Sequence, residues 1–112
     1  MTKYHNRKVQ LDGYTFDSMA EAEHYKDLRL LEQAGEITYL LVHPRFEVMP
    51  KVGKERAIVY VADFCYTERD NPNRYIVVDV KGVETAVFRL KANLFRRAYP
   101  NHELRIVRKE GR

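Results

Sequence analysis

Apolar residues recur at two different spacings along the chain, and each spacing predicts a type of secondary structure. Residues 9–11 and 14–16 flank Asp12-Gly13, a dipeptide typical of a tight β-hairpin turn. Residues 18–34 have apolar side chains at helical spacing, a Ser-x-x-Glu capping motif at their start and Gly35 directly after them. We therefore expect a small β-ribbon followed by a helix.

The remainder of the chain predicts strands and a second helix. Several segments are rich in β-branched and aromatic residues and are separated by Pro, Gly or Asn. One expected strand covers residues 37–42 and resumes as residues 45–49 after a break at Pro44, which we expect at a sheet edge or a bend. The other expected strands are residues 58–66, 75–82 and 104–107. Residues 84–99 predict a helix that ends before Pro100. The order ribbon-α-β-β-β-α-β predicts one α/β domain over residues 1–112, with a central mixed β-sheet flanked by helices.

Two strands that face each other across the polar loop 68–73 each contain one acid among apolar residues, Asp63 and Asp79. If the loop is centred on Asn71, Asp63 lies directly opposite Asp79. Like charges in such a facing pair repel each other, so the pair requires a shared proton or a cation between its members. Lys81 follows Asp79 by two residues, and strand alternation places it on the same face.

The two predicted helices add further charged residues to this region. Glu21 belongs to the inward stripe of the first helix with Tyr25 and Leu28, although a lone glutamate at this position more often only caps the helix. In the second helix Lys91 falls within the apolar stripe. That expected stripe consists of Val87, Leu90, Leu94, Phe95 and Ala98.

Composition limits the class of protein. Hydrophobic residues make up 45% of the chain and charged residues 32%, which indicates a folded globular domain. The net charge of +4 suits a polyanionic partner without requiring one. A single cysteine, Cys65, excludes a disulfide framework. No apolar run is long enough to cross a membrane and no signal peptide is evident, so we expect a cytoplasmic protein.

The acids and Lys81 form a set with a definite chemistry. Carboxylate oxygens are the ligands that Mg²⁺ and Mn²⁺ prefer. A divalent ion can polarise a phosphoryl oxygen and activate water, and a neighbouring lysine can orient that water or stabilise the negative transition state. The set is therefore complete for hydrolysis of a phosphodiester.

The order of these residues also resembles a known family. Asp63 followed by Asp79-Val80-Lys81 in the next strand, with Glu21 on a preceding helix, is similar to the PD-(D/E)XK nuclease superfamily. Nearly the whole chain resembles a small phage and prophage family within it, whose members are Holliday-junction-resolvase-like. The matching segments are Asp12-Gly13, Phe16-Asp17-Ser18, Glu21-Ala22, Ala62-Asp63-Phe64, Asp79-Val80-Lys81-Gly82, Phe88-Arg89-Leu90-Lys91 and Tyr99-Pro100. Ala62 departs from the proline of the superfamily's name.

The resemblance implies a restriction-endonuclease-like core and a Mg²⁺-dependent endodeoxyribonuclease, with Mn²⁺ as a substitute. It makes Glu21, Asp63 and Asp79 catalytic residues and metal ligands, with a water-positioning acid as the alternative role of Glu21. The carbonyl of Val80 is implied as a further ligand. The expected substrate is branched or structured DNA in phage recombination or replication.

The resemblance also assigns the two lysines. Lys81 is the expected catalytic lysine, and Lys91 is an auxiliary catalytic residue that binds phosphate. The expected location is the cytoplasm of a bacterial or phage-infected cell. Cutting both strands of a symmetric junction would call for a two-fold homodimer.

Alternative interpretations remain. The chain can be a catalytically silent nucleic-acid-binding domain on the same fold, or an interaction protein in which Asp63 and Lys81 form a buried ion pair. Arg89, Arg96 and Arg97 are either a solvated helix face or contacts to a phosphate backbone. A histidine-metal nuclease is disfavoured because the histidines are scattered, and each is expected at the surface or in a cap. The histidines are His5, His24, His43 and His102.

Overall fold

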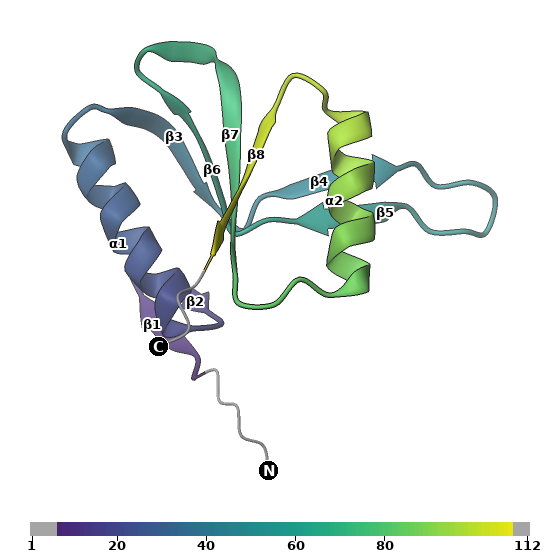
Figure 1. The fold of residues 1–112 in the computed structure, drawn as a ribbon, viewed down its shortest axis with the longest axis horizontal. Helices are drawn as coiled ribbons and strands as arrows, with labels where there is room; N and C mark the ends of the chain where they lie inside the picture. The colour runs from purple at the N-terminus through teal and green to yellow at the C-terminus, as the bar shows by residue number, and fades with distance from the viewer. Residues whose placement is uncertain (1–6, 109–112) are drawn as a thin grey trace.

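A computed structural model describes residues 7–108 of the chain, with two helices and eight strands in that range. Figure 1 shows their arrangement. In chain order the elements are β1 (Val9–Leu11), β2 (Tyr14–Phe16), α1 (Met19–Gln33), β3 (Ile37–Val42), β4 (Arg45–Met49), β5 (Ile58–Val61), β6 (Phe64–Glu68), β7 (Asn71–Lys81), α2 (Ala86–Ala98) and β8 (Glu103–Arg108).

The central sheet has four strands in the order β3-β6-β7-β8. β3, β6 and β7 are antiparallel neighbours, whereas β7 and β8 are parallel and are connected through α2. A parallel pair needs such a crossover because the chain must return to the starting end of the sheet. The predicted α/β class, with a mixed sheet, two helices and an opening β-hairpin, is confirmed.

The two faces of the sheet belong to two hydrophobic clusters. Tyr25 and Leu28 of α1 pack with Phe64 and Val78 on one face. Phe88 and Phe95 of α2 belong to the second cluster, which includes Val77 from the other face. Because side chains alternate along a strand, successive residues of β7 enter different clusters. No helix in the described range 7–108 is long and apolar enough to cross a membrane.

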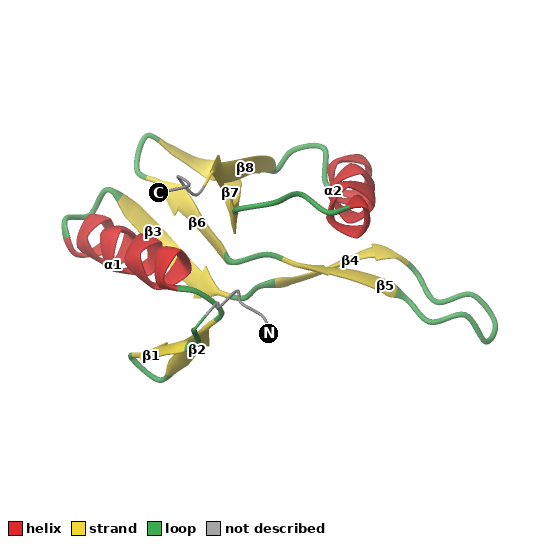
Figure 2. Ribbon diagram, turned by 60° about the horizontal axis from the view of Figure 1, so that its bottom comes forward, coloured by secondary structure: helices red, strands yellow, loops and turns green. Residues whose placement is uncertain are grey.

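β3 to β6 form one long antiparallel hairpin that is bent in the middle. Val42 pairs with Phe64 on one side of the bend, and Arg45 pairs with Val61 on the other, in the same continuous register. Two backbone hydrogen bonds close the bend: His43 N donates to Asp63 O at 2.9 Å, and Ala62 N donates to Pro44 O at 3.1 Å. The outer half, β4 and β5, extends away from the central sheet (Figure 2).

The bend corrects the predicted strand 58–66. This run is divided into β5 and β6 at Ala62-Asp63, because its two halves pair with β4 and with β3 and β7 respectively. The predicted break at Pro44 is confirmed.

The register of the β6–β7 hairpin is confirmed, although its loop is shorter than expected. Phe64 pairs with Val78 and Thr67 with Tyr75, as a centre at Asn71 requires. The predicted loop 68–73 is wrong, however, because Glu68 pairs with Asn71 after a bulge. A bulge places unequal numbers of residues on the two strands, so it shortens the turn without moving the inner register.

The face of α2 also differs from the prediction. Phe88, Ala92 and Phe95 are buried, whereas Val87 and Leu90 are 64% and 60% exposed. The buried stripe is thus displaced by about one residue from the predicted one. Aromatic rings bury more apolar area than Val or Leu, and here Phe88 and Phe95 set the rotation of the helix.

Candidate metal centre

Glu21 lies in the first turn of α1, where it has two roles. Ser18 caps the helix by accepting a hydrogen bond from Glu21 N at 3.1 Å, and Glu21 Oε1 accepts one from Asp17 N at 3.1 Å. The side chain is nevertheless directed inward, and the residue is only 6% exposed. Glu21 Oε1 also lies 3.5 Å from His43 Nε2. Glu21 therefore caps the helix and faces the sheet, so the inward orientation predicted from the helical stripe is confirmed.

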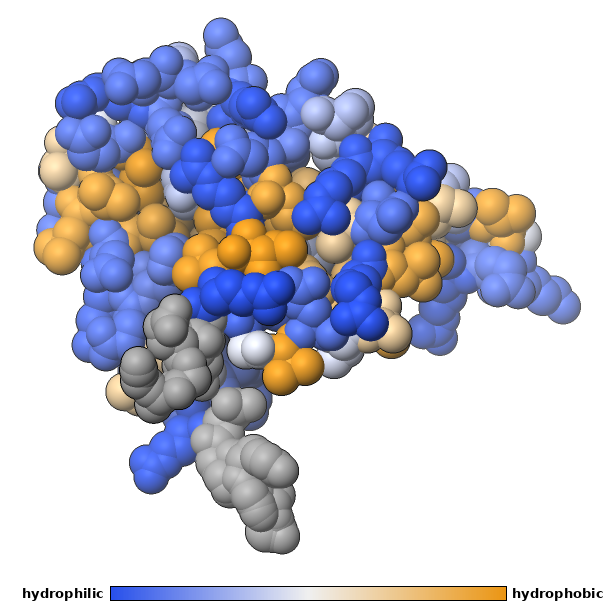
Figure 3. Space-filling model, viewed as in Figure 1, coloured by the Kyte–Doolittle hydropathy of each residue, from blue (hydrophilic) through white to orange (hydrophobic). Residues whose placement is uncertain are grey.

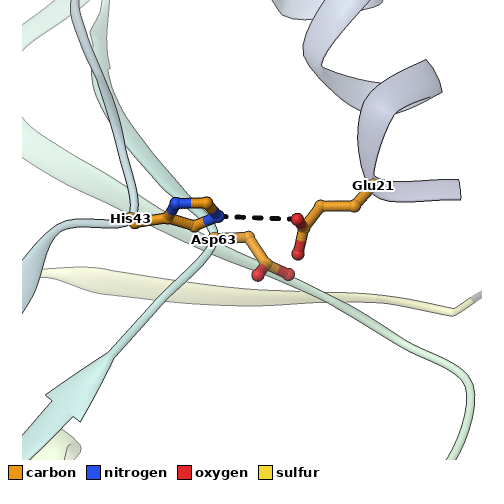
Figure 4. A group of neighbouring side chains, drawn as sticks. All are labelled: Glu21, His43 and Asp63. Carbon is orange, nitrogen blue, oxygen red and sulfur yellow. Dashed lines mark hydrogen bonds and ion pairs between the residues drawn. The ribbon is translucent and has the colours of Figure 1, made fainter. Parts of the chain in front are cut away.

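His43 and Asp63 come from the two strands of the bent hairpin. They face each other at the bend, where His43 has a φ of 55° and its backbone N–H bonds to Asp63 O. The ligand atoms of Glu21, His43 and Asp63 all lie within 4.8 Å of one another (Figure 4). One cation can therefore contact a group from a helix and groups from both sides of the bend.

Asp79 is buried beside this group on the neighbouring strand β7. It is 1% exposed and accepts a hydrogen bond from the hydroxyl of Tyr60 on β5. Lys81 Nζ lies 3.6 Å from Asp79 Oδ1 and 4.4 Å from the centre of the Phe88 ring. The predicted shared face of Asp79 and Lys81 is confirmed by this distance.

Asp63 connects the two parts of the cluster. Its Oδ2 accepts a hydrogen bond from Val80 N at 2.6 Å. Burial, with a contribution from Glu21, raises the pKa of Asp63 to about 7. Burial likewise raises the pKa of Asp79 to about 7, with the Asp63 charge adding to the rise while the Tyr60 hydrogen bond and Lys81 oppose it. The carboxylates therefore either hold protons near neutral pH or require a compensating cation.

The chemistry of these side chains fits a divalent metal ion. Carboxylate oxygens suit Mg²⁺ and Mn²⁺, and an imidazole nitrogen adds affinity for first-row transition metals. Burial and the neighbouring carboxylate also raise the pKa of Tyr60, so the phenol keeps its proton and donates to Asp79. Glu21, His43 and Asp63 can thus bind a metal, with Asp79 beside them.

Lys91 lies beside the cluster rather than within it. Together with Lys81, Thr85 and Tyr60, it lines a surface pocket next to β5. The pocket carries two ammonium groups, and its Tyr60 wall is hydrogen-bonded to Asp79. An anion in this pocket would therefore lie close to the carboxylates.

Sequence reasoning missed two members of the site. His43 was expected in a surface or capping role, but it is half-buried against Glu21. Tyr60 was not assigned to the site from the sequence, yet its hydroxyl donates a hydrogen bond to Asp79. One signal was present: a hairpin centred on Gly53 places His43 opposite Asp63, as the observed register does.

Among comparisons with known proteins, the family model "Protein of unknown function (DUF1064)" matches residues 1–111. No curated protein and no solved structure matches the chain.

Proposed function

The chain belongs to the DUF1064 family, whose function is unknown, and we propose that it is a metal-dependent DNA endonuclease. The observation that carries the proposal is the convergence of three acids, an imidazole and a lysine at one bend of the sheet. Glu21, His43 and Asp63 form a group that can bind a metal, and Asp79 interacts with Asp63 and Lys81. A purely structural role does not require three acids to approach one another in a buried site.

The proposed metal site is formed by Glu21, Asp63 and Asp79, with His43 as an additional ligand and the carbonyl of Val80 as a further oxygen. Mg²⁺ is the proposed ion, and Mn²⁺ is a substitute that His43 would favour. When bound, such an ion supplies Lewis acidity for a phosphoryl oxygen and for water. The Val80 N–H holds Asp63, and the Tyr60 hydroxyl holds Asp79.

The lysines have separate proposed roles. Lys81 is held by Asp79 and by the face of Phe88, so its ammonium is directed toward the carboxylates. From this position it can orient the attacking water and stabilise negative charge at the phosphorus. Lys91 lines the adjacent pocket and can hold a neighbouring phosphate of the same strand.

The proposed substrate is branched or structured DNA, as the resemblance to resolvase-like phage nucleases implies. Each domain has a single site and would cut one strand. A two-fold dimer would therefore be needed to cut a symmetric junction on both strands.

The test compares cleavage of a labelled four-way junction, duplex and single-stranded DNA in Mg²⁺, Mn²⁺ or EDTA. We expect cleavage that needs metal and is lost by about 100-fold or more in Asp79→Ala and Lys81→Ala. The matched control is Asp70→Ala, since Asp70 is exposed at the opposite end of the same hairpin. Cleavage by Asp79→Ala at the wild-type rate would exclude this site. Binding without any cleavage by the wild type would favour the silent nucleic-acid-binding domain.

A further inference from the structure

The outer half of the bent hairpin projects from the body of the protein. We call residues 45–61 the arm: β4, β5 and the loop between them. Figures 1 and 2 show it extending beyond α2, on the side away from α1. Its base is fixed by packing of Phe46 on Phe95, with ring centres 5.0 Å apart, and by the Tyr99 hydroxyl, which donates to Glu47 O at 2.9 Å. The arm is therefore held in a defined direction at its base.

The tip of the arm is basic and exposed. Lys51, Lys54 and Arg56 all lie at the surface, with Glu55 as the one acid of residues 50–57. Reciprocal backbone hydrogen bonds between Val52 and Glu55, at 2.8 and 3.1 Å, close the turn and hold the lysines on it. Figure 3 shows mostly hydrophilic residues at this far end, beside a small hydrophobic patch. Within residues 7–108, none of the three basic side chains forms an ion pair.

The arm begins at the candidate metal centre. His43 and Asp63 lie at its base, and Tyr60 of β5 contacts Asp79. From Arg45 to Val52 the chain rises about 3.3 Å per residue over roughly eight residues, a reach of about 26 Å. Base pairs are stacked about 3.4 Å apart, so this reach corresponds to roughly eight base pairs.

A two-stranded β-ribbon of this kind can lie along a DNA duplex, whose major groove is wide enough to admit it. We propose that the arm binds the DNA duplex that flanks the cleavage point, with Lys51 and Lys54 contacting backbone phosphates roughly eight base pairs away. This inference rests on the proposed function, which places DNA at the base of the arm. Lysine carries a point charge and lacks the planar guanidinium with which arginine forms paired hydrogen bonds to guanine. The proposed contact is therefore to phosphate and is independent of DNA sequence.

The experiment measures binding of the full chain by fluorescence anisotropy in EDTA over a series of salt concentrations. The substrates are junctions whose duplex arms are either 20 or 5 base pairs long. The test variant is Lys51→Gln/Lys54→Gln. The control, Lys26→Gln/Arg74→Gln, removes the same charge from exposed positions on α1 and β7. Circular dichroism checks that both variants are folded.

We expect the test variant to bind the long-armed junction about tenfold more weakly, with the slope of log K against log salt reduced by about 2. Its binding to the short-armed junction should match wild type, and the control should match wild type on both. Equal affinity of the test variant and wild type for the long-armed junction would overturn the inference, as would an equal loss on both junctions.

The outcomes also separate this inference from the proposed function. If the wild type cleaves DNA and the arm variant binds DNA as well as the wild type, the proposed nuclease function stands and the proposed role of the arm is excluded. If binding depends on the arm but the wild type cleaves no DNA, the proposed role of the arm stands and the proposed nuclease function is excluded. A wild-type protein that binds no DNA would overturn both.

Discussion

At the scale of single residues, Asp63 is the residue that connects the other members of the candidate site. It faces His43 across the bend, lies beside Asp79, and receives a hydrogen bond from Val80 N. Glu21 approaches it from α1. A carboxylate with two acidic neighbours must be neutralised by a proton or by a cation. Measuring stability as a function of pH and of added metal distinguishes the two cases.

The first prediction concerns pH. In the folded chain the pKa of Asp63 and that of Asp79 are near 7, well above the value near 4 of an unfolded aspartate. Between about pH 4 and 7 the folded state therefore binds more protons than the unfolded state. The free energy of unfolding in EDTA should fall as pH rises through this window and should level off above it. Urea unfolding from pH 4.5 to 8 measures this slope.

Asp63→Asn should flatten that slope and raise the free energy of unfolding at pH 7.5 by roughly 1–3 kcal/mol in EDTA, because it removes a charge from the cluster. The asparagine oxygen can still accept from Val80 N. Asp70→Asn, at the exposed turn of the same hairpin, should change neither quantity. The alternative ion pair between Asp63 and Lys81 is not formed, because Lys81 pairs with Asp79. A marked loss of stability in Asp63→Asn would therefore contradict the prediction and show that the Asp63 charge stabilises the fold.

At the scale of secondary-structure elements, the two helices differ in how well their sequence predicts their orientation. The stripe of α1 is as expected, because Glu21, Tyr25 and Leu28 are buried and Glu23 is exposed. α2 is amphipathic too, but it offers two overlapping apolar stripes. Packing against the base of the arm selects the one that carries Phe88 and Phe95.

The second prediction tests this face of α2. Phe95→Ala should lower the free energy of unfolding by about 3–5 kcal/mol, because Phe95 is fully buried among Phe46, Tyr60 and Tyr99. Leu90→Ala should cost no more than about 0.5 kcal/mol, since Leu90 is 60% exposed. Urea unfolding of both variants at one pH measures the difference. A loss in Leu90→Ala as large as the loss in Phe95→Ala would indicate the stripe expected from sequence, which contains both residues.

At the scale of the whole molecule, the candidate metal centre and the neighbouring Asp79 join four parts of the chain. Glu21 comes from α1, His43 and Asp63 from the two sides of the bend, and Asp79 from β7. A ligand that binds all of them in the folded state, and none of them together in the unfolded chain, must stabilise the fold by mass action.

The third prediction follows from this linkage. A metal at about 100 times its dissociation constant should add about 2.7 kcal/mol to the free energy of unfolding, which raises Tm by roughly 10 °C. In His43→Ala the shift should shrink more with MnCl₂ than with MgCl₂, because imidazole favours the transition metal. Differential scanning fluorimetry measures both shifts.

The control for the metal prediction is His24→Ala, which should keep both shifts because His24 packs on Phe64 and is no part of the group. Equal shifts in wild type and His43→Ala with both metals would exclude His43 as a ligand.

The sequence by itself determined most of the elements, the orientation of Glu21 and the facing register of β6 and β7. These follow from local periodicity, because a buried face fixes which alternate residues point inward. Only the tertiary structure decided the bend, the face of α2 and the roles of His43 and Tyr60. Each of these depends on contacts between segments far apart in the chain: the bend brings His43 to Asp63, and β5 brings Tyr60 to Asp79. Apart from the hairpin symmetry about Gly53, which relates His43 to Asp63, no local pattern in the sequence indicates these contacts, because they form only when separate elements pack together.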